Sequence, residues 1–244
     1  MLKLSVNLNK VATLRNTRAV GYPAVTAAAE ACIAAGAHGI TVHPRPDERH
    51  IRRQDVFDLV PVVQSVEYNI EGNPFHNLVA LAKEVCPTQV TLVPDSVGQS
   101  TSDHGWDLKQ DGERLKPVIT ELKSYGCRVS LFMDAIPSNM KPAAQLGADR
   151  IELYTEPYAE AYHTPNREKV WQQFADSAKA AADCGLGVNA GHDLSLVNLA
   201  KFSEIPEIQE VSIGHAFIAD SLWYGMEQTT KKYLAAIAAG RSKI

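Results

Sequence analysis

The stretch AGAHGITVH at residues 35–43 joins a helix-ending glycine, a strand and a titratable side chain. Glycine just past a helix takes the left-handed conformation at little cost, so Gly36 predicts the end of a helix. The β-type run that starts at Gly39 predicts a short strand, which ends at His43. A histidine in this position, followed by another helix, is typical of enzymes that collect their active sites at the carboxyl ends of parallel strands.

The same pattern recurs along the chain. Three other glycines stand between a helical segment and a predicted strand, and three other predicted strands end at a titratable side chain. The glycines are Gly126, Gly147 and Gly185, and the titratable residues are Glu71, His192 and His215. The recurrence indicates a repeated strand–helix unit and favours an enzyme.

Predicted strands alternate with helical segments over the whole chain. The strands are expected at residues 3–8, 39–43, 68–71, 89–93, 128–133, 150–155, 187–190 and 210–213. The helices are expected at residues 24–35, 55–66, 75–85, 113–125, 137–145, 167–184, 195–202 and 221–239. This alternation predicts an α/β fold in which residues 1–244 form a single (β/α)8 TIM barrel, whose usual size is about 250 residues. An open doubly wound sheet would give much the same local pattern and remains the alternative.

Composition and charge narrow the classes of partner. The net charge is −4, so the chain lacks the overall basic field that attracts nucleic acid or an anionic membrane, and any anion must be bound by a local cluster. The four cysteines form neither a Cys-x-x-Cys pair nor a zinc-ligand spacing, and we expect reduced, mostly buried thiols. With no apolar signal core and no run of about 18 apolar residues, the sequence predicts a cytoplasmic protein.

The first candidate for catalysis is Glu71. In the run YNIE at residues 68–71 the side chains alternate, so Asn69 and Glu71 share one face and Ile70 points away. If that face is the barrel interior, poor hydration raises the pKa of Glu71 toward the range useful for general acid–base catalysis. The alternative is a hydrated glutamate at a strand end.

Two segments predict phosphate binding. The loop at residues 43–50 carries Arg45, Arg49 and His50, and guanidinium groups bind phosphate in a bidentate geometry. Gly214 ends the last predicted strand just before a helix, where backbone N–H groups bind phosphate in many barrels. A hydrated charged loop and a simple tight turn are the respective alternatives.

Lys10 follows the first strand and has three interpretations. It is a cation at the barrel mouth, a Schiff-base amine if it is buried and deprotonated, or a surface lysine. The histidines never form His-x-His or His-x-x-x-His, which disfavours a metallohydrolase, although four strand-end groups could in principle converge on a metal.

Ten segments together resemble the PdxJ family of pyridoxine 5′-phosphate synthases. They occur in the family's order and span almost the whole chain, which makes the set far more specific than any one motif. The segments are SVN (5–7), ATLRN (12–16), GITVHxR (39–45), RHI (49–51), NIE (69–71), LVP (92–94), VSLF (129–132), IE (151–152), VNAGH (188–192) and IGHA (213–216).

The resemblance implies a (β/α)8 barrel with extra helices for oligomer contacts, usually in a homo-octamer. It implies a ring-closing condensation of 1-deoxy-D-xylulose 5-phosphate with 3-amino-2-oxopropyl phosphate, which gives pyridoxine 5′-phosphate, phosphate and water without a metal or organic cofactor. In the family pattern His43 and Glu71 match proton acceptors, and His192 matches a proton donor. Asn7, Arg18, Gly214 and His215 match positions around the amino-ketone phosphate; Arg45, His50 and Thr101 match those around the sugar phosphate, and Glu152 matches a further strand-end acid.

Two places depart from the family pattern. Many members have Asp-His where this chain has Asn9-Lys10, and glycine where it has Asp193. The resemblance therefore transfers no role to these positions, although Lys10 and Asp193 remain candidates for substrate binding. Two rival functions stay open: a sugar-phosphate aldolase or isomerase barrel that uses Lys10 as a Schiff-base nucleophile, and a non-catalytic protein that binds phosphorylated metabolites.

Overall fold

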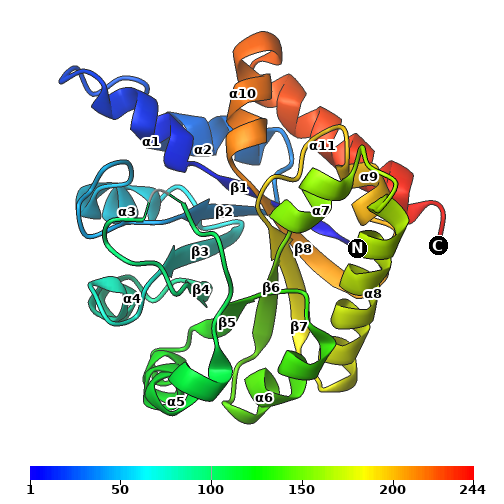
Figure 1. Ribbon diagram of the computed structural model, residues 1–244. Helices are drawn as coiled ribbons and strands as arrows, with labels where there is room; N and C mark the ends of the chain where they lie inside the picture. The colour runs from blue at the N-terminus through cyan, green and yellow to red at the C-terminus, as the bar shows by residue number, and fades with distance from the viewer. Residues whose placement is uncertain (100) are drawn as a thin grey trace.

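A closed barrel of eight parallel strands forms the centre of the molecule (Figure 1). The structure is a computed structural model that describes residues 1–99 and 101–244. Strand order follows the chain, and β1 closes the barrel by pairing with β8, which rules out the open sheet and confirms the predicted α/β barrel. The strands are β1 (Lys3–Asn7), β2 (Gly39–Val42), β3 (Glu67–Gly72), β4 (Gln89–Leu92), β5 (Arg128–Met133), β6 (Arg150–Tyr154), β7 (Gly187–Gly191) and β8 (Ile208–Ile213).

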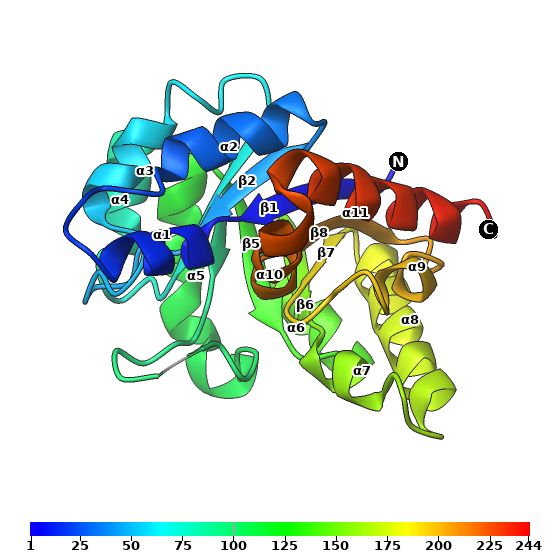
Figure 2. The ribbon, with the colours of Figure 1, turned by 90° about the horizontal axis from the view of Figure 1, so that it is seen from above.

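Helices cover the outer face of the barrel, and α2 and α11 pack against each other over β1 (Figure 2). No helix among the described residues is both long enough and apolar enough to span a membrane. The helices are α1 (Asn9–Asn16), α2 (Val25–Ala34), α3 (Arg53–Leu59), α4 (Leu78–Val85), α5 (Leu108–Ser124), the 3-10 helix η1 (Pro137–Asn139), α6 (Met140–Gln145), α7 (Glu156–Ala161), α8 (Arg167–Asp183), α9 (Leu199–Phe202), α10 (His215–Tyr224) and α11 (Met226–Arg241).

Two predicted helices are wrong in extent. The helix expected at 55–66 ends at Leu59, because Pro61 has no N–H with which to continue the helical hydrogen bonds. The single helix expected at 221–239 is instead the two helices α10 and α11. Gly225 separates them, and its φ of 74° and ψ of 157° cannot belong to a helix.

Two helices, α1 and α7, are absent from the prediction. Helix α1 is short and largely polar, and it buries only Val11, Ala12 and Arg15. Helix α7 starts with a proline in its first turn, where a missing N–H costs nothing, although proline elsewhere breaks helices. Helices α4 and α9 begin later than expected and α5 begins earlier, and both kinds of difference arise at helix ends, the least predictable part of a helix.

The strands carry polar side chains into the barrel and apolar side chains outward. Inside, Ser5 Oγ lies 2.7 Å from Thr41 Oγ1, and Asn189 of β7 donates across the barrel to Gln89 of β4 at 3.4 Å. The residues between these positions, such as Ile40, belong to the apolar core beneath the helices. Alternation along each strand therefore produces a polar interior within an apolar shell.

The glycines predicted to end helices do so. Gly36, Gly126, Gly147 and Gly185 have φ values of 103°, 82°, 91° and 81°, the left-handed region that glycine adopts most cheaply. Cys86 takes the same left-handed conformation at the end of α4, with a φ of 48°, at a greater steric cost than glycine.

The prediction that the cysteines are mostly buried is only partly correct, since Cys32 and Cys127 are buried and Cys86 and Cys184 are exposed.

Replacing Gly126 by alanine tests the conformational role of these glycines. No atom of residues 1–99 or 101–244 outside the adjoining chain lies within 4 Å of the added Cβ, so any effect reports backbone strain rather than collision. We expect Gly126→Ala to lower the free energy of unfolding by about 1 kcal/mol, measured by urea denaturation. The control is Gly98→Ala, which has no neighbour within 4 Å among the described residues and lies outside the left-handed region, with an expected change within about 0.5 kcal/mol. Equal changes in the two variants would contradict the assignment.

Candidate active site

A cavity of about 320 Å³ opens at the carboxyl ends of the strands, and segments at the ends of all eight strands contribute to its lining. Except for Arg18, every site residue predicted from the sequence lines this cavity. Those residues are Asn7, Lys10, His43, Arg45, His50, Glu71, Thr101, Glu152, His192, Asp193, Gly214 and His215. Arg18 lies on the exposed segment that follows α1, away from the lining.

The structure adds lining residues that the sequence did not indicate. They are Asn9, Val93, Ser102, Phe132, Glu156 and Ser212. Ser212 was detectable in principle, because it stands two residues from Gly214 at the end of β8 and alternation places it on the inner face. Ser102 lies on the long segment between β4 and α5, where no period reveals which side chains turn inward.

Glu71 shares the interior face of β3 with Asn69, as predicted. Asn69 Nδ2 and Asn7 Nδ2 donate to its two carboxyl oxygens at 3.4 and 3.5 Å, distances too long to stabilise the charged form strongly. Burial, together with the nearby carboxyl of Glu152, raises the pKa of Glu71 well above its usual value. Glu71 therefore carries a proton at neutral pH more readily than an ordinary glutamate.

Glu152 on β6 is a second protonated acid. Burial, with a contribution from the Glu210 carboxyl, raises the pKa of Glu152 to about 8. Its Oε2 is buried and has no hydrogen-bond partner among the described residues, which suits the neutral form. Gly191 on β7 leaves the space for this side chain, because a Cβ there would collide with Glu152 Oε1.

Three imidazoles face the two acids. Burial and the Arg45 guanidinium lower the pKa of His43 well below its usual value, and the same causes lower the pKa of His50 to about 4. Burial also lowers the pKa of His192, whose ring packs against Tyr154 at a centroid distance of 5.3 Å. Neutral imidazoles and protonated carboxyls thus coexist at one pH.

Over residues 1–99 and 101–244, no three His, Cys, Asp or Glu side chains are arranged to hold a metal ion.

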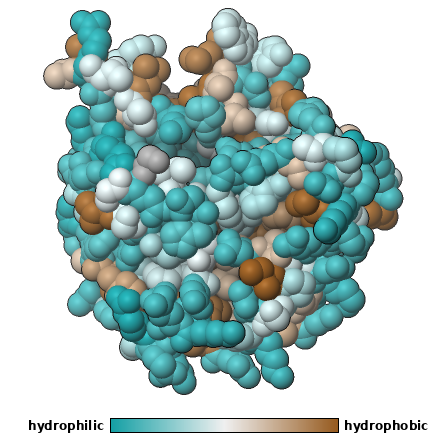
Figure 3. All heavy atoms as spheres, viewed as in Figure 1, coloured by the Kyte–Doolittle hydropathy of each residue, from teal (hydrophilic) through white to brown (hydrophobic). Residues whose placement is uncertain are grey.

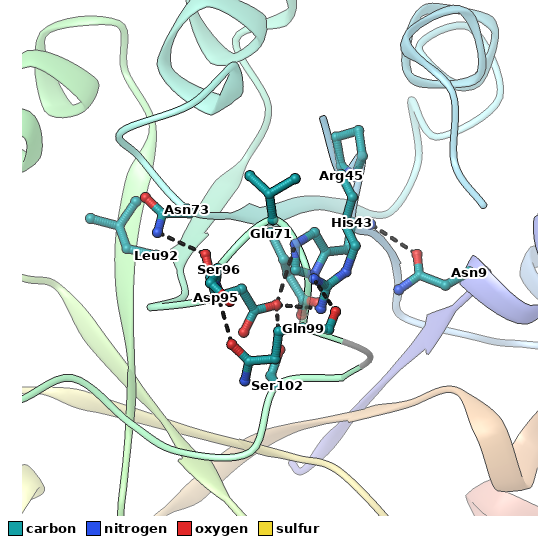
Figure 4. A network of polar contacts seen from close by, with 12 residues as sticks. Asn9, His43, Arg45, Glu71, Asn73, Leu92, Asp95, Ser96, Gln99 and Ser102 are labelled. Atoms are coloured by element: carbon teal, nitrogen blue, oxygen red, sulfur yellow. Dashed lines mark hydrogen bonds and ion pairs between the residues drawn. The ribbon is translucent and has the colours of Figure 1, made fainter. Parts of the chain in front are cut away.

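Arg45 is held by a buried acid that the sequence did not indicate (Figure 4). Its Nη2 donates to Asp95 Oδ2 at 2.5 Å, and its Nη1 donates to the carbonyl of Gln99 at 3.0 Å. Ser102 Oγ donates to the same oxygen of Asp95 at 2.9 Å. The position of Asp95 just after β4 was the available signal, since other strand-end acids were considered as candidates.

The last two strands end in backbone geometry suited to an anion. Gly214 stands at the N-terminal end of α10, and a Cβ there would approach the Asn7 side chain to 3.2 Å. His192 and Asp193 both have positive φ, 86° and 55°. Asp193 stands where the resemblance described above places glycine, and its left-handed backbone explains why glycine suits that place. Aspartate tolerates this conformation better than most residues.

Asn9 and Lys10 differ in the structure: Asn9 is hydrogen-bonded within the fold, whereas Lys10 presents a positive charge. Asn9 Oδ1 accepts a hydrogen bond from the backbone N–H of His43 at 2.9 Å, so it holds the end of β2. Lys10 is exposed on α1, lines the cavity, and forms no ion pair with the rest of the described chain. Its exposure argues against a desolvated Schiff-base amine and favours a charge at the cavity mouth.

Known proteins match the chain over nearly its full length. The family model described as pyridoxal phosphate biosynthesis protein PdxJ matches residues 4–239. The chain is 56% identical, over 98% of its length and 99% of the relative, to a pyridoxine 5′-phosphate synthase of Albidiferax ferrireducens. It is 55% identical, over 97% of its length and 96% of the relative, to a pyridoxine 5′-phosphate synthase of Xanthomonas campestris. A tryptophan synthase structure from M. tuberculosis shares the fold with a TM-score of 0.64 at 13% identity, over 98% of this chain and 93% of that one.

The raised pKa of Glu152 predicts a pH-dependent contribution to stability. The folded pKa of about 8 exceeds the ordinary 4.5, so folding binds a proton and the contribution is lost as pH rises through 8. Glu152→Gln has no such proton, so its melting temperature relative to wild type should rise between pH 5 and 8 by at least about 2–4 °C, the shift that about 1 kcal/mol produces. Calorimetry at several pH values measures this difference. The exposed Glu168→Gln is the control, and parallel curves for Glu152→Gln and wild type would refute the prediction.

Proposed function

The chain belongs to the PdxJ family and acts as a pyridoxine 5′-phosphate synthase in vitamin B6 biosynthesis, and we propose that its cavity condenses 1-deoxy-D-xylulose 5-phosphate with 3-amino-2-oxopropyl phosphate. The observation that carries the proposal is the convergence of acids, imidazoles and phosphate-binding groups from all eight strands on one cavity. No single segment of the chain holds more than a fraction of these groups.

Two sets of residues suited to phosphate, at two ends of the cavity, support the assignment of two phosphorylated substrates. Arg45, with His50 and Thr101, lies on the loops after β2 and β4 and would bind the sugar phosphate. The N-terminal end of α10 at Gly214, with His215 and Asn7, would bind the amino-ketone phosphate. The carbon skeletons would then meet between the two ends, which supplies orientation before any chemistry.

The reaction requires both acids and bases in one cavity. The amine condenses with the sugar ketone, phosphate is eliminated, and a second condensation with loss of water closes the aromatic ring. Each stage moves protons on and off carbon, nitrogen and oxygen. We assign His43 and Glu71 as proton acceptors and His192 as a donor, each contributing about 10²–10⁴-fold. The raised pKa makes the Glu71 carboxylate a stronger base, and the lowered pKa keeps the His43 imidazole unprotonated and therefore able to accept a proton.

Glu152 supports the same assignment as a neutral acid beside Glu71. With a pKa of about 8 it retains its proton at neutral pH and can donate a hydrogen bond to an oxygen that gains charge. A second ionised carboxylate there would instead repel the first.

The proposal includes a homo-octamer in the cytoplasm. Large apolar side chains are exposed at the end of α10 and on the segment after α1, including Trp223 at 80% and Tyr22 at 78% exposure. Figure 3 shows apolar surface on the two projections that carry these elements at the top of the molecule. Such side chains favour burial against another subunit. The four unpaired cysteines suit a reducing compartment.

A product assay tests the proposed function, and Glu71→Gln tests its chemistry. Wild-type protein with both substrates should release phosphate and form the pyridine product, detected by absorbance and mass spectrometry. Glu71→Gln keeps the shape of the side chain but removes its titrating group, so we expect at least about a 100-fold loss of kcat with near-normal folding. Glu168→Gln on the surface of α8 is the control. Binding of both substrates without phosphate release would favour the non-catalytic alternative.

Two substitutions distinguish the possible roles of Lys10. Because the exposed ammonium lies at the cavity mouth, Lys10→Met should raise the KM for a phosphorylated substrate several-fold, by roughly 1 kcal/mol of lost attraction. Lys10→Arg keeps the charge and should retain much of the activity, although guanidinium cannot form a Schiff base at neutral pH. An inactive but folded Lys10→Arg would support the aldolase-like alternative. Unchanged kinetics in Lys10→Met would show that Lys10 is a bystander.

A further inference from the structure

Asp95 lies directly behind the cavity wall. The residue is 3% exposed, and the three groups that it approaches, on His43, Arg45 and Ser102, all line the cavity. Its backbone carbonyl accepts a hydrogen bond from Asn73 Nδ2 at 2.9 Å, which ties the segment after β4 to the segment after β3. Asp95 is therefore fixed through both its backbone and its side chain.

One oxygen of Asp95 connects the two functional groups that follow β2. Oδ2 accepts from Arg45 Nη2 at 2.5 Å and lies 3.8 Å from His43 Nε2, as Figure 4 shows. Ser102 Oγ donates to the same oxygen at 2.9 Å and limits its movement. Arginine has five N–H donors, and the contacts with Asp95 and the Gln99 carbonyl leave others for a phosphate.

Asp95 lies beside His43 among several positively charged side chains. The titratable and charged groups around His43 come from five segments: Lys10 on α1; Arg45, Arg49 and His50 after β2; Glu71 on β3; Asp95 after β4; and His192 after β7. Arg45 and Arg49 oppose protonation of His43. A carboxylate 3.8 Å from Nε2 attracts the protonated imidazole and counters part of that effect.

We propose that Asp95 is a positioning residue that holds the Arg45 guanidinium beside the His43 imidazole, so that both meet the same sugar phosphate. The inference rests on the proposed function, because it assigns Arg45 to the sugar phosphate and His43 to proton transfer. Asp95 acts through these two side chains and contacts no substrate itself. Its contribution is to keep both in the productive arrangement before substrate binds.

The test is Asp95→Asn, which preserves the shape of the side chain but removes its charge. We expect the KM for the sugar phosphate to rise about tenfold, whereas the KM for the amino-ketone changes less than about twofold. Loss of the negative charge also disfavours protonated His43. The acid limb of the pH profile, where kcat/KM falls toward low pH, should therefore move to lower pH. A residue with a purely structural role would lower the active fraction without moving the limb or separating the two KM values.

Two further variants complete the experiment. Asp149→Asn removes an ion-paired carboxylate at the opposite end of the barrel and should leave both KM values and the pH profile unchanged. Asp95→Glu keeps the charge and should hold the acid limb near that of wild type while still raising the KM for the sugar phosphate. If Asp95→Asn fails to fold, as judged by circular dichroism, the separation of the two KM values in Asp95→Glu decides the question.

The outcomes separate this inference from the proposed function. Product formation by wild type together with an unmoved acid limb and equal KM changes in Asp95→Asn would overturn the inference alone. Absence of product in wild type would overturn the function. In that case NMR titration of His43 in both proteins still tests the electrostatic contact with Asp95, since it needs no turnover. A lower His43 pKa in Asp95→Asn supports the contact, and an unchanged pKa refutes it.

Discussion

The pairing of β1 with β8 is the constraint on which the rest of the structure depends. Closing the sheet gives every strand an inside and an outside, and the alternation of side chains then sorts polar residues inward and apolar residues outward. The apolar side chains pack beneath the helices, so the core lies between the barrel and its helical layer. The interior is left free for polar groups, which hydrogen-bond to one another across the barrel.

This polar interior explains how acids and bases coexist in the cavity. Burial disfavours the charged form of both kinds of group, so it raises the pKa of Glu71 and Glu152 and lowers that of His43 and His192. The same desolvation therefore makes the ionised carboxylates stronger bases and the protonated imidazoles stronger acids. Arg45 and its partner Asp95 form a buried ion pair beside these groups.

Local patterns predicted much of this arrangement and failed at identifiable places. The helix-ending glycines such as Gly126 and the shared face of Asn69 and Glu71 were correct, because both depend on neighbouring residues only. The break at Gly225 was missed because glycine inside an apolar helical pattern is often tolerated. Asp95 was missed because the segment after β4 has no period, and its importance lies in contact with a residue fifty positions away.

The sequence by itself determined the strands, the helix ends marked by glycine and the titratable groups that follow the strands. These follow from side-chain alternation, backbone conformation and the titratable groups themselves, which act over a few residues. Only the tertiary structure decided which of these groups meet, that Lys10 is exposed and that Arg18 stands outside the cavity of this chain. It also decided the pKa shifts, since burial and charge act between side chains that are distant in sequence and adjacent only after the barrel closes.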